Sequence, residues 1–81
     1  MSRRHATIRT TVDDPELVAA ALRPDNTSEM DTTVEDDAVV TTIERDTTGG
    51  LRTTTDDYVV NLTVANEIVQ QADNFTQSNH E

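Results

Sequence analysis

The spacing of apolar residues changes along the chain from every second position to every third or fourth, and this change constrains the fold more than any other feature. Apolar and polar residues alternate over residues 5–12, 30–35 and 38–46, and such alternation predicts half-buried strands. From Leu51 the intervals become four and three, which predicts a helix that runs to about Asp73. The apolar stripe of this helix consists of Leu51, Thr55, Tyr58, Leu62, Ala65 and Val69.

A short helix is predicted between the first two strands. Asp13 and Asp14 are followed by Pro15, and an acidic cap with proline in the first turn is typical of a helix start. We expect this helix to reach about Leu22 and to end before Pro24. Its buried side chains are expected to be Leu17, Val18, Ala21 and Leu22, and its outward ones Ala19 and Ala20.

These elements predict an α+β fold of order β-α-β-β-α. Asp36 and Asp37 form a tight reversal that joins the second and third strands in a hairpin. A three-stranded antiparallel sheet with both helices on one face follows from this order. Residues 1–73 are expected to form this single domain, residues 47–50 to be a glycine-containing loop within it, and residues 74–81 to be a frayed polar tail. Because so small a domain buries little surface alone, we expect an oligomer or a bound partner.

Charge is distributed unevenly along the chain, which has no lysine. Residues 13–81 hold three arginines and all sixteen acids, a net charge of −13, whereas residues 1–12 hold three arginines and no acid, a net charge of +3. The missing lysine and the many Asp and Thr residues indicate a salt-accumulating haloarchaeal cytoplasm. Repulsion between carboxylates is screened there, because the Debye length is only about 3 Å at 1 M salt. We therefore expect the domain to fold in molar KCl and to unfold in dilute buffer.

No pattern in the sequence is typical of an active site. The absence of cysteine excludes disulfides and thiolate metal sites. His5 and His80 have no second ligand at a metal-like spacing, and Gly49-Gly50 lacks the neighbours of a phosphate-binding loop. We therefore expect no enzymatic activity, no metal and no cofactor. The lack of a long apolar run and of a signal core predicts a cytoplasmic protein without a membrane span.

The second predicted helix has more apolar residues than a small sheet can cover. We interpret the surplus, with the outward alanines of the first helix, as a partner-binding surface. The alternative interpretation is scattered exposure of single apolar residues, which proteins tolerate. The residues of this surface are Ala19, Ala20, Val60, Val64 and Ile68.

The first strand has a basic face, which allows two interpretations. Arg3, His5 and Arg9 share one side of the strand, and Arg4 is adjacent. One interpretation is contact with RNA phosphates, and the other is charge balance with the protein's own carboxylates. Each phosphate contact loses nearly a decade of affinity per tenfold rise in salt, so three arginines lose about 2.7 decades. In molar salt this strand therefore cannot hold RNA tightly outside a larger assembly.

Two stretches resemble a known family. Residues 21–26 (ALRPDN) are similar to the "ALxPD" stretch of the small dimerisation subunit of the KEOPS complex, the CTAG/L-antigen family. The resemblance covers about residues 5–72, and the glycines at 49–50 depart from the family pattern. The second stretch, which resembles that family's "LR…N…L" second helix, consists of Leu51-Arg52, Asn61-Leu62 and Glu67.

The resemblance implies a non-catalytic subunit that homodimerises and docks through its two helices onto the threonylcarbamoyl-transferase subunit of KEOPS. That complex, which also contains a small kinase/ATPase, makes threonylcarbamoyladenosine next to the anticodon of tRNA. The family's small subunit is also implicated in tRNA engagement. The candidate RNA-binding residues are Arg3, Arg4, His5, Arg9 and Arg52, although Arg52 is equally explained by a partner contact or by charge at the helix start.

Two other functions remain open from the residues alone. The first is a stand-alone nucleic-acid-binding module that uses the basic first strand. The lack of aromatic residues for base stacking counts against it, since Tyr58 and Phe75 are the only aromatics. The second is an acidic interaction protein that folds only on its partner.

Overall fold

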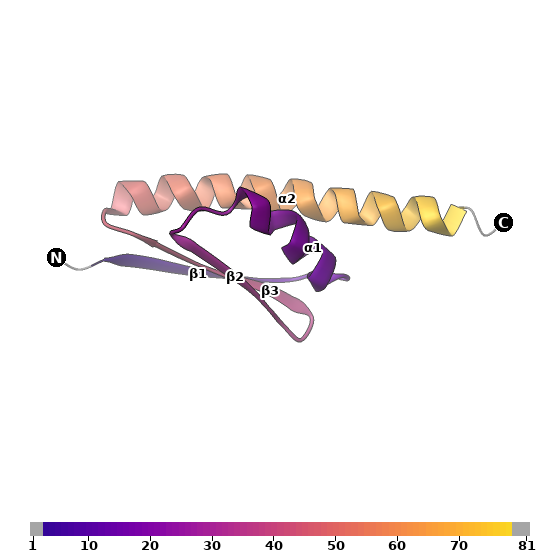
Figure 1. The fold of residues 1–81 in the computed structure, drawn as a ribbon. Helices are drawn as coiled ribbons and strands as arrows, with labels where there is room; N and C mark the ends of the chain where they lie inside the picture. Colours follow the sequence, from indigo (N-terminus) through magenta and orange to yellow (C-terminus); the bar gives the residue numbers. More distant parts are fainter. Residues whose placement is uncertain (1–2, 79–81) are drawn as a thin grey trace.

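The computed structural model describes the backbone of residues 3–78 and the side chains of residues 3–72 (Figure 1). The predicted α+β fold of order β-α-β-β-α is confirmed. Between the first helix and the second strand the chain also makes one short 3-10 helix. The elements are β1 (Arg4–Thr11), α1 (Pro15–Leu22), η1 (Arg23–Asp25), β2 (Met30–Glu35), β3 (Ala38–Arg45) and α2 (Thr48–Ser78).

The sheet has β3 at its centre, with β1 and β2 antiparallel to it on either side. In the register, Ile43 of β3 lies between Ala6 of β1 and Met30 of β2. The predicted hairpin is confirmed at Asp36-Asp37, where Asp36 has φ of 56°. Two-residue hairpin turns of the primed types need a positive φ at this position, and aspartate enters that region more readily than most residues.

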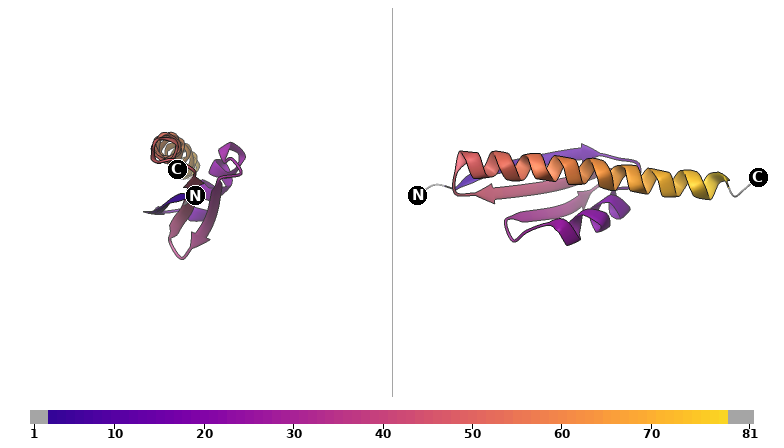
Figure 2. Two further views of the ribbon diagram at one scale, coloured as in Figure 1. Left: turned by 90° about the vertical axis from the view of Figure 1, so that its left-hand side faces the viewer. Right: turned by 90° about the horizontal axis from the view of Figure 1, so that it is seen from above.

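Both helices cover the same face of the sheet, as predicted (Figure 1). α2 lies against β1 and β3, and α1 lies against β2 and β3. The end-on view in Figure 2 shows the two helices side by side above the strands. The far part of α2 projects beyond the sheet (Figure 1).

One apolar core fills the space between the sheet and the helices. The stripe predicted for α2 is confirmed, because its central members Tyr58, Leu62, Ala65 and Val69 are buried. Ile8, Val12, Met30, Val34 and Leu51 pack around the core with part of their surface exposed. The buried core residues are Val18, Ala19, Leu22, Val39, Ile43, Tyr58, Leu62, Ala65 and Val69.

A chain of hydrogen bonds, here called the polar chain, passes through this core and consists of Asn26, Thr32, Thr41 and Tyr58. Asn26 Nδ2 donates to Thr32 Oγ1 at 2.7 Å, and the hydroxyls of Thr32 and Thr41 are 2.8 Å apart. Thr41 Oγ1 then donates to the Tyr58 hydroxyl at 2.7 Å. Burial raises the pKa of the Tyr58 phenol, and the bond from Thr41 opposes that rise. The polar chain gives each of its own buried hydroxyls, those of Thr32, Thr41 and Tyr58, a hydrogen-bond partner, as a stable core requires.

α1 begins as predicted, but its buried side is different. Asp14 caps it by accepting a hydrogen bond from the backbone of Leu17 at 3.4 Å. The prediction that Ala19 faces outward is wrong, because Ala19 is fully buried in the core. The predicted burial of Leu17 and Ala21 is also wrong, since both are exposed. Three consecutive alanines carry no periodic signal, so packing against the sheet decides which side of this helix is buried.

α2 begins at Thr48 rather than at Leu51, so the loop predicted over residues 47–50 is wrong. Thr47 Oγ1 accepts a hydrogen bond from the backbone N–H of Gly50 at 2.9 Å. This bond satisfies one of the free N–H groups at the helix start, which allows both glycines to be helical. The helix continues to Ser78, beyond the predicted end, and the other tail residues, 79–81, lie outside the described residues.

Candidate functional site

Three exposed aliphatic side chains form a continuous surface on α2, here called the α2 stripe. Val60, Val64 and Ile68 are 61%, 50% and 58% exposed. Because residues four apart in a helix lie on adjacent turns of one side, the three side chains are neighbours. Their predicted exposure is confirmed, whereas their role in binding stays a prediction.

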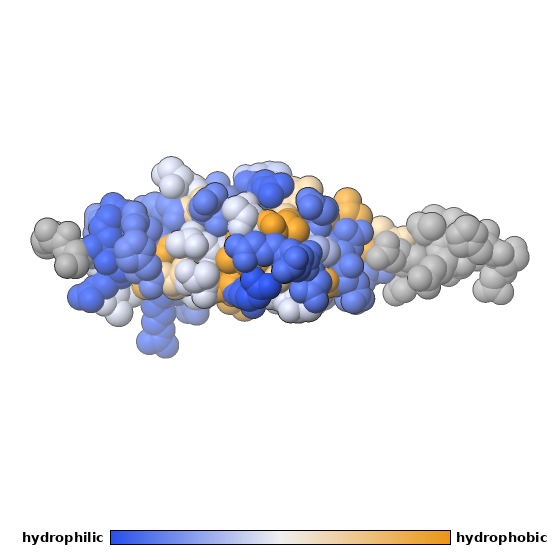
Figure 3. All heavy atoms as spheres, turned by 90° about the horizontal axis from the view of Figure 1, so that it is seen from below, coloured by the Kyte–Doolittle hydropathy of each residue, from blue (hydrophilic) through white to orange (hydrophobic). Residues whose placement is uncertain are grey.

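The α2 stripe is open because the small sheet covers only one side of α2. Leu17 of α1 and Val59 of α2 are also about half exposed, so apolar surface extends beyond the stripe. Of the two alanines predicted to join it, Ala20 is exposed and Ala19 is buried. Figure 3, seen from the sheet side, shows by contrast a mainly hydrophilic surface with scattered apolar patches.

The charges next to the α2 stripe are negative. Asp56 and Asp57 precede it along the helix, and Glu67 lies within its length. From Thr53 to the end of α2 the sequence has no arginine or lysine. A partner that presents an apolar surface with a basic rim would therefore be complementary to this side of α2.

The beginning of the basic strand is engaged by the protein's own carboxylates. Arg3 Nε lies 2.9 Å from Glu44 Oε1, and its Nη1 lies 3.2 Å from Asp46 Oδ1. His5 Nδ1 lies 3.2 Å from the other oxygen of Glu44. These contacts join β1 to the end of β3 on the outer face of the sheet, where solvent screens them. They favour charge balance over phosphate contact for Arg3 and His5.

The remaining predicted RNA-binding residues do not form one surface. Arg9 Nη1 lies 3.0 Å from Glu35 Oε1, again on the outer face. Arg4 is on the helix side of β1, and Arg52 is near the start of α2. Both are exposed, and neither side chain makes a hydrogen bond or ion pair with another residue in the described part of the chain. The five residues are therefore divided between two faces and two different environments.

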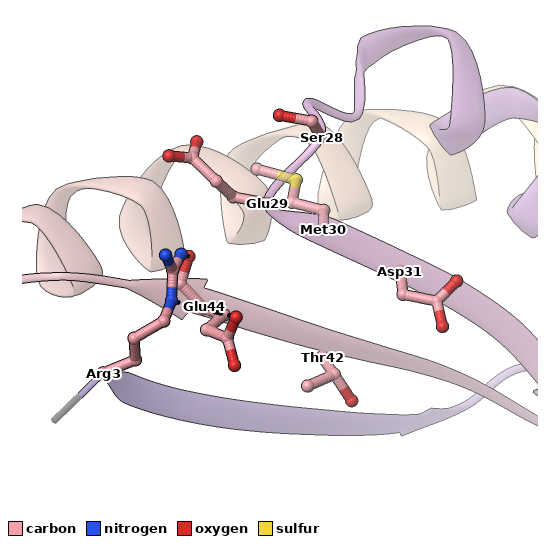
Figure 4. Close-up of a pocket in the computed structure, with 7 residues that line it drawn as sticks. All are labelled: Arg3, Ser28, Glu29, Met30, Asp31, Thr42 and Glu44. Atoms are coloured by element: carbon pink, nitrogen blue, oxygen red, sulfur yellow. Dashed lines mark hydrogen bonds and ion pairs between the residues drawn. The ribbon is translucent and has the colours of Figure 1, made fainter.

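An open groove of about 340 Å³ lies across one end of the sheet (Figure 4). Its charged groups are already paired in part: Arg3 contacts Glu44, and Glu29 Oε2 lies 3.3 Å from Arg45 Nε. Among the residues that the structure describes, no group of three His, Asp or Glu side chains is arranged to hold a metal ion. The sequence did not indicate this groove, because its walls come from segments far apart in the chain. The lining residues are Arg3, Ser28, Glu29, Met30, Asp31, Thr42 and Glu44.

The described part of the chain presents three surface features. They are the apolar stripe on α2, the outer face of the basic strand, where Arg3, His5 and Arg9 each contact a carboxylate, and the open polar groove. Over residues 3–78 no helix combines the length and the apolar character that a membrane span needs. In comparison with known proteins, the chain matches no protein-family model and has no significant match among curated proteins.

Proposed function

We propose that this chain is a non-catalytic dimerisation and scaffold subunit of a haloarchaeal KEOPS complex. The observation that carries the proposal is the α2 stripe, an apolar surface that the domain's own sheet leaves uncovered. The order β-α-β-β-α and the resemblance over residues 21–26 and along α2 support the choice of complex. In this role the protein would be cytoplasmic, would need no cofactor, and would be required for threonylcarbamoyladenosine modification of tRNA next to the anticodon.

The residues that carry the resemblance have structural roles that are consistent with this proposal. Leu22 is buried in the core, and Pro24 lies in η1, which redirects the chain toward β2. Arg23 donates to the backbone carbonyl of Thr32 at 3.5 Å, and Asn26 begins the polar chain. This stretch therefore fixes the connection between α1 and the sheet, and it leaves the exposed side of α2 free for a partner.

In the proposal, the α2 stripe docks the threonylcarbamoyl-transferase subunit, and the kinase/ATPase subunit is reached only through it. Complete burial of a valine or isoleucine is worth roughly 1.5–3 kcal/mol. Covering the exposed half of three such side chains therefore contributes roughly 2–5 kcal/mol. This contribution persists in molar salt, where exposed ion pairs are screened.

The proposal is tested by co-purification with the transferase subunit in molar KCl. Val64→Asp places a charge in the middle of the α2 stripe and should abolish co-elution. Gln70→Asp adds the same charge on the opposite flank of α2, where the side chain is also exposed, and should leave co-elution intact. A chain that elutes as a strict monomer and ignores the transferase subunit would refute the proposal.

The stand-alone nucleic-acid-binding module is less well supported. Arg3, His5 and Arg9 each face a carboxylate of the same chain, so binding a phosphate would first require breaking an internal ion pair. Tight, salt-tolerant RNA binding by the isolated chain, lost in an Arg3→Ala and Arg9→Ala double variant, would reverse this judgement. In the proposed function, tRNA is engaged through the assembled complex.

A further inference from the structure

α2 has two apolar sides, of which the core covers one. Ala65 and Val69 are buried, whereas Val64 and Ile68 are half exposed. Each residue of an α-helix turns by about 100°, so a rotation of α2 by one residue would bring Val64 and Ile68 to the places that Ala65 and Val69 hold now. Hydrophobic burial is non-directional. At these two positions apolar contact alone therefore does not decide which side faces the sheet. One turn earlier, however, the same rotation would put Asn61 in the place of the buried Leu62.

Directional contacts hold the preceding turns of α2 to β3. Thr41 Oγ1 donates to the Tyr58 hydroxyl at 2.7 Å, and both side chains are fully buried. Arg45 Nη1 donates to Thr54 Oγ1 and, at 3.4 Å, to the backbone carbonyl of Gly50. Because Gly50, Thr54 and Tyr58 are four residues apart, these bonds follow one side of the helix.

We infer that these hydrogen bonds, and above all the polar chain that ends at Tyr58, act together with the burial of Leu62 to select which apolar side of α2 packs on the sheet and which stays open to a partner. Rotation by one residue would break the bond between Thr41 and Tyr58 and leave buried hydroxyls without partners, which is more costly than an ordinary lost bond. It would also move Asp57 toward the place of Tyr58, where a carboxylate would be buried unpaired.

The polar chain also connects α2 to parts of the fold outside this helix. Thr41 lies on the central strand, Thr32 on its neighbour β2, and Asn26 just after η1. Hydrogen-bonded networks in a low-dielectric core specify one arrangement because each member depends on its neighbours. The orientation of α2 is thus linked to the connection between α1 and β2. Only the consequence for docking rests on the proposed function; the orientation of α2 does not.

Single-cysteine probes test the inference, because the chain contains no cysteine of its own. Val64→Cys reports the open side and Ala65→Cys the buried side, each in the full chain in molar KCl. With the polar chain intact, a thiol reagent should modify the first probe much faster than the second. In a Thr41→Val and Tyr58→Phe background, we expect the ratio of the two rates to fall about tenfold, which corresponds to about 1.4 kcal/mol.

The double background removes the hydroxyls of Thr41 and Tyr58 together, and Thr32 keeps the hydrogen bond that it accepts from Asn26, so the variant should stay folded. Thr41→Ser keeps the hydroxyl and should keep the original ratio. An unchanged ratio in a double variant with native circular dichroism would overturn the inference. A double variant that does not fold would also overturn the inference, because the polar chain would then hold the domain together instead of selecting the side of α2 that faces the sheet. Since no partner takes part, a failure to bind the transferase subunit would count only against the proposed function.

Discussion

Arg9 on β1 and Glu35 on β2 meet across the central strand, with Arg9 Nη1 3.0 Å from Glu35 Oε1. The pair joins the two edge strands on the outer face, but both side chains remain half exposed. In a double-mutant cycle with Arg9→Gln and Glu35→Gln, we expect a coupling of about 0–1 kcal/mol, measured by urea unfolding in molar KCl. A larger coupling would show that this pair, and not the core, holds the edges of the sheet together.

The fold should depend strongly on salt. With a net charge of −10 and exposed ion pairs that offset only part of it, the domain is destabilised by repulsion wherever screening is weak. We expect native circular dichroism in molar KCl and a largely unfolded spectrum in dilute buffer. Equal spectra in the two solvents would contradict the haloarchaeal interpretation.

Two isoleucines allow stability and docking to be separated. Ile43 is fully buried on the central strand, whereas Ile68 is exposed in the α2 stripe. Ile43→Ala should cost about 2–5 kcal/mol of the free energy of unfolding, because it leaves a cavity. Ile68→Ala should change that free energy by less than about 0.5 kcal/mol. In co-purification with the transferase subunit of the proposed complex, Ile68→Ala should reduce recovery of that subunit. Full recovery would exclude Ile68 from the proposed docking surface.

The two glycines at the start of α2 should respond differently to alanine. A Cβ on Gly49 would meet nothing within 4 Å, so Gly49→Ala should raise the free energy of unfolding by about 0.4–1 kcal/mol. A Cβ on Gly50 would lie 3.0 Å from Thr47 Oγ1 and 3.1 Å from the Arg45 guanidinium. Gly50→Ala should therefore gain less than Gly49→Ala or destabilise the protein. Equal gains at both positions, measured by urea unfolding, would contradict the close contact.

Tyr58 should make the protein sensitive to high pH. Burial raises the pKa of its phenol in the folded state above the ordinary value of about 10. As the pH rises past 10, the unfolded chain therefore loses the phenol proton first, and the free energy of unfolding falls. It should keep falling until the pH passes the folded pKa. Tyr58 is the only tyrosine, so phenolate absorbance followed with circular dichroism reports its ionisation. Tyr58→Phe should remove this contribution of the phenol to the pH dependence. If the free energy of unfolding of that variant falls equally above about pH 10, the phenol is not the cause of the fall.

Much of the fold could be predicted from the sequence because its signals are local. β2 begins and ends where the alternation of residues 30–35 predicts, and the spacing from Leu51 identifies the buried stripe of α2. The burial of Ala19 could not be predicted, because alanine suits either side of a helix. The start of α2 depends on a bond from Gly50 to Thr47, which composition does not reveal.

The candidate site was predictable only in its apolar part. The surplus of valines on α2 is visible in the spacing, so Val60 and Val64 could be identified. The pairing of the basic strand could not, because Glu35 and Glu44 approach β1 only after the sheet is assembled. A positive segment in an acidic chain thus carries little information about binding until the positions of its carboxylates are known.

α2 projects beyond the sheet, so the sheet does not set the length of the molecule. A helix rises 1.5 Å per residue, so the 31 residues of α2 span about 46 Å, whereas an eight-residue strand spans roughly 26 Å. Among the side chains that the structure describes, which end at residue 72, Val69 is the last core residue of α2. The length of α2, and not the size of the sheet, therefore sets how far the protein reaches in this direction.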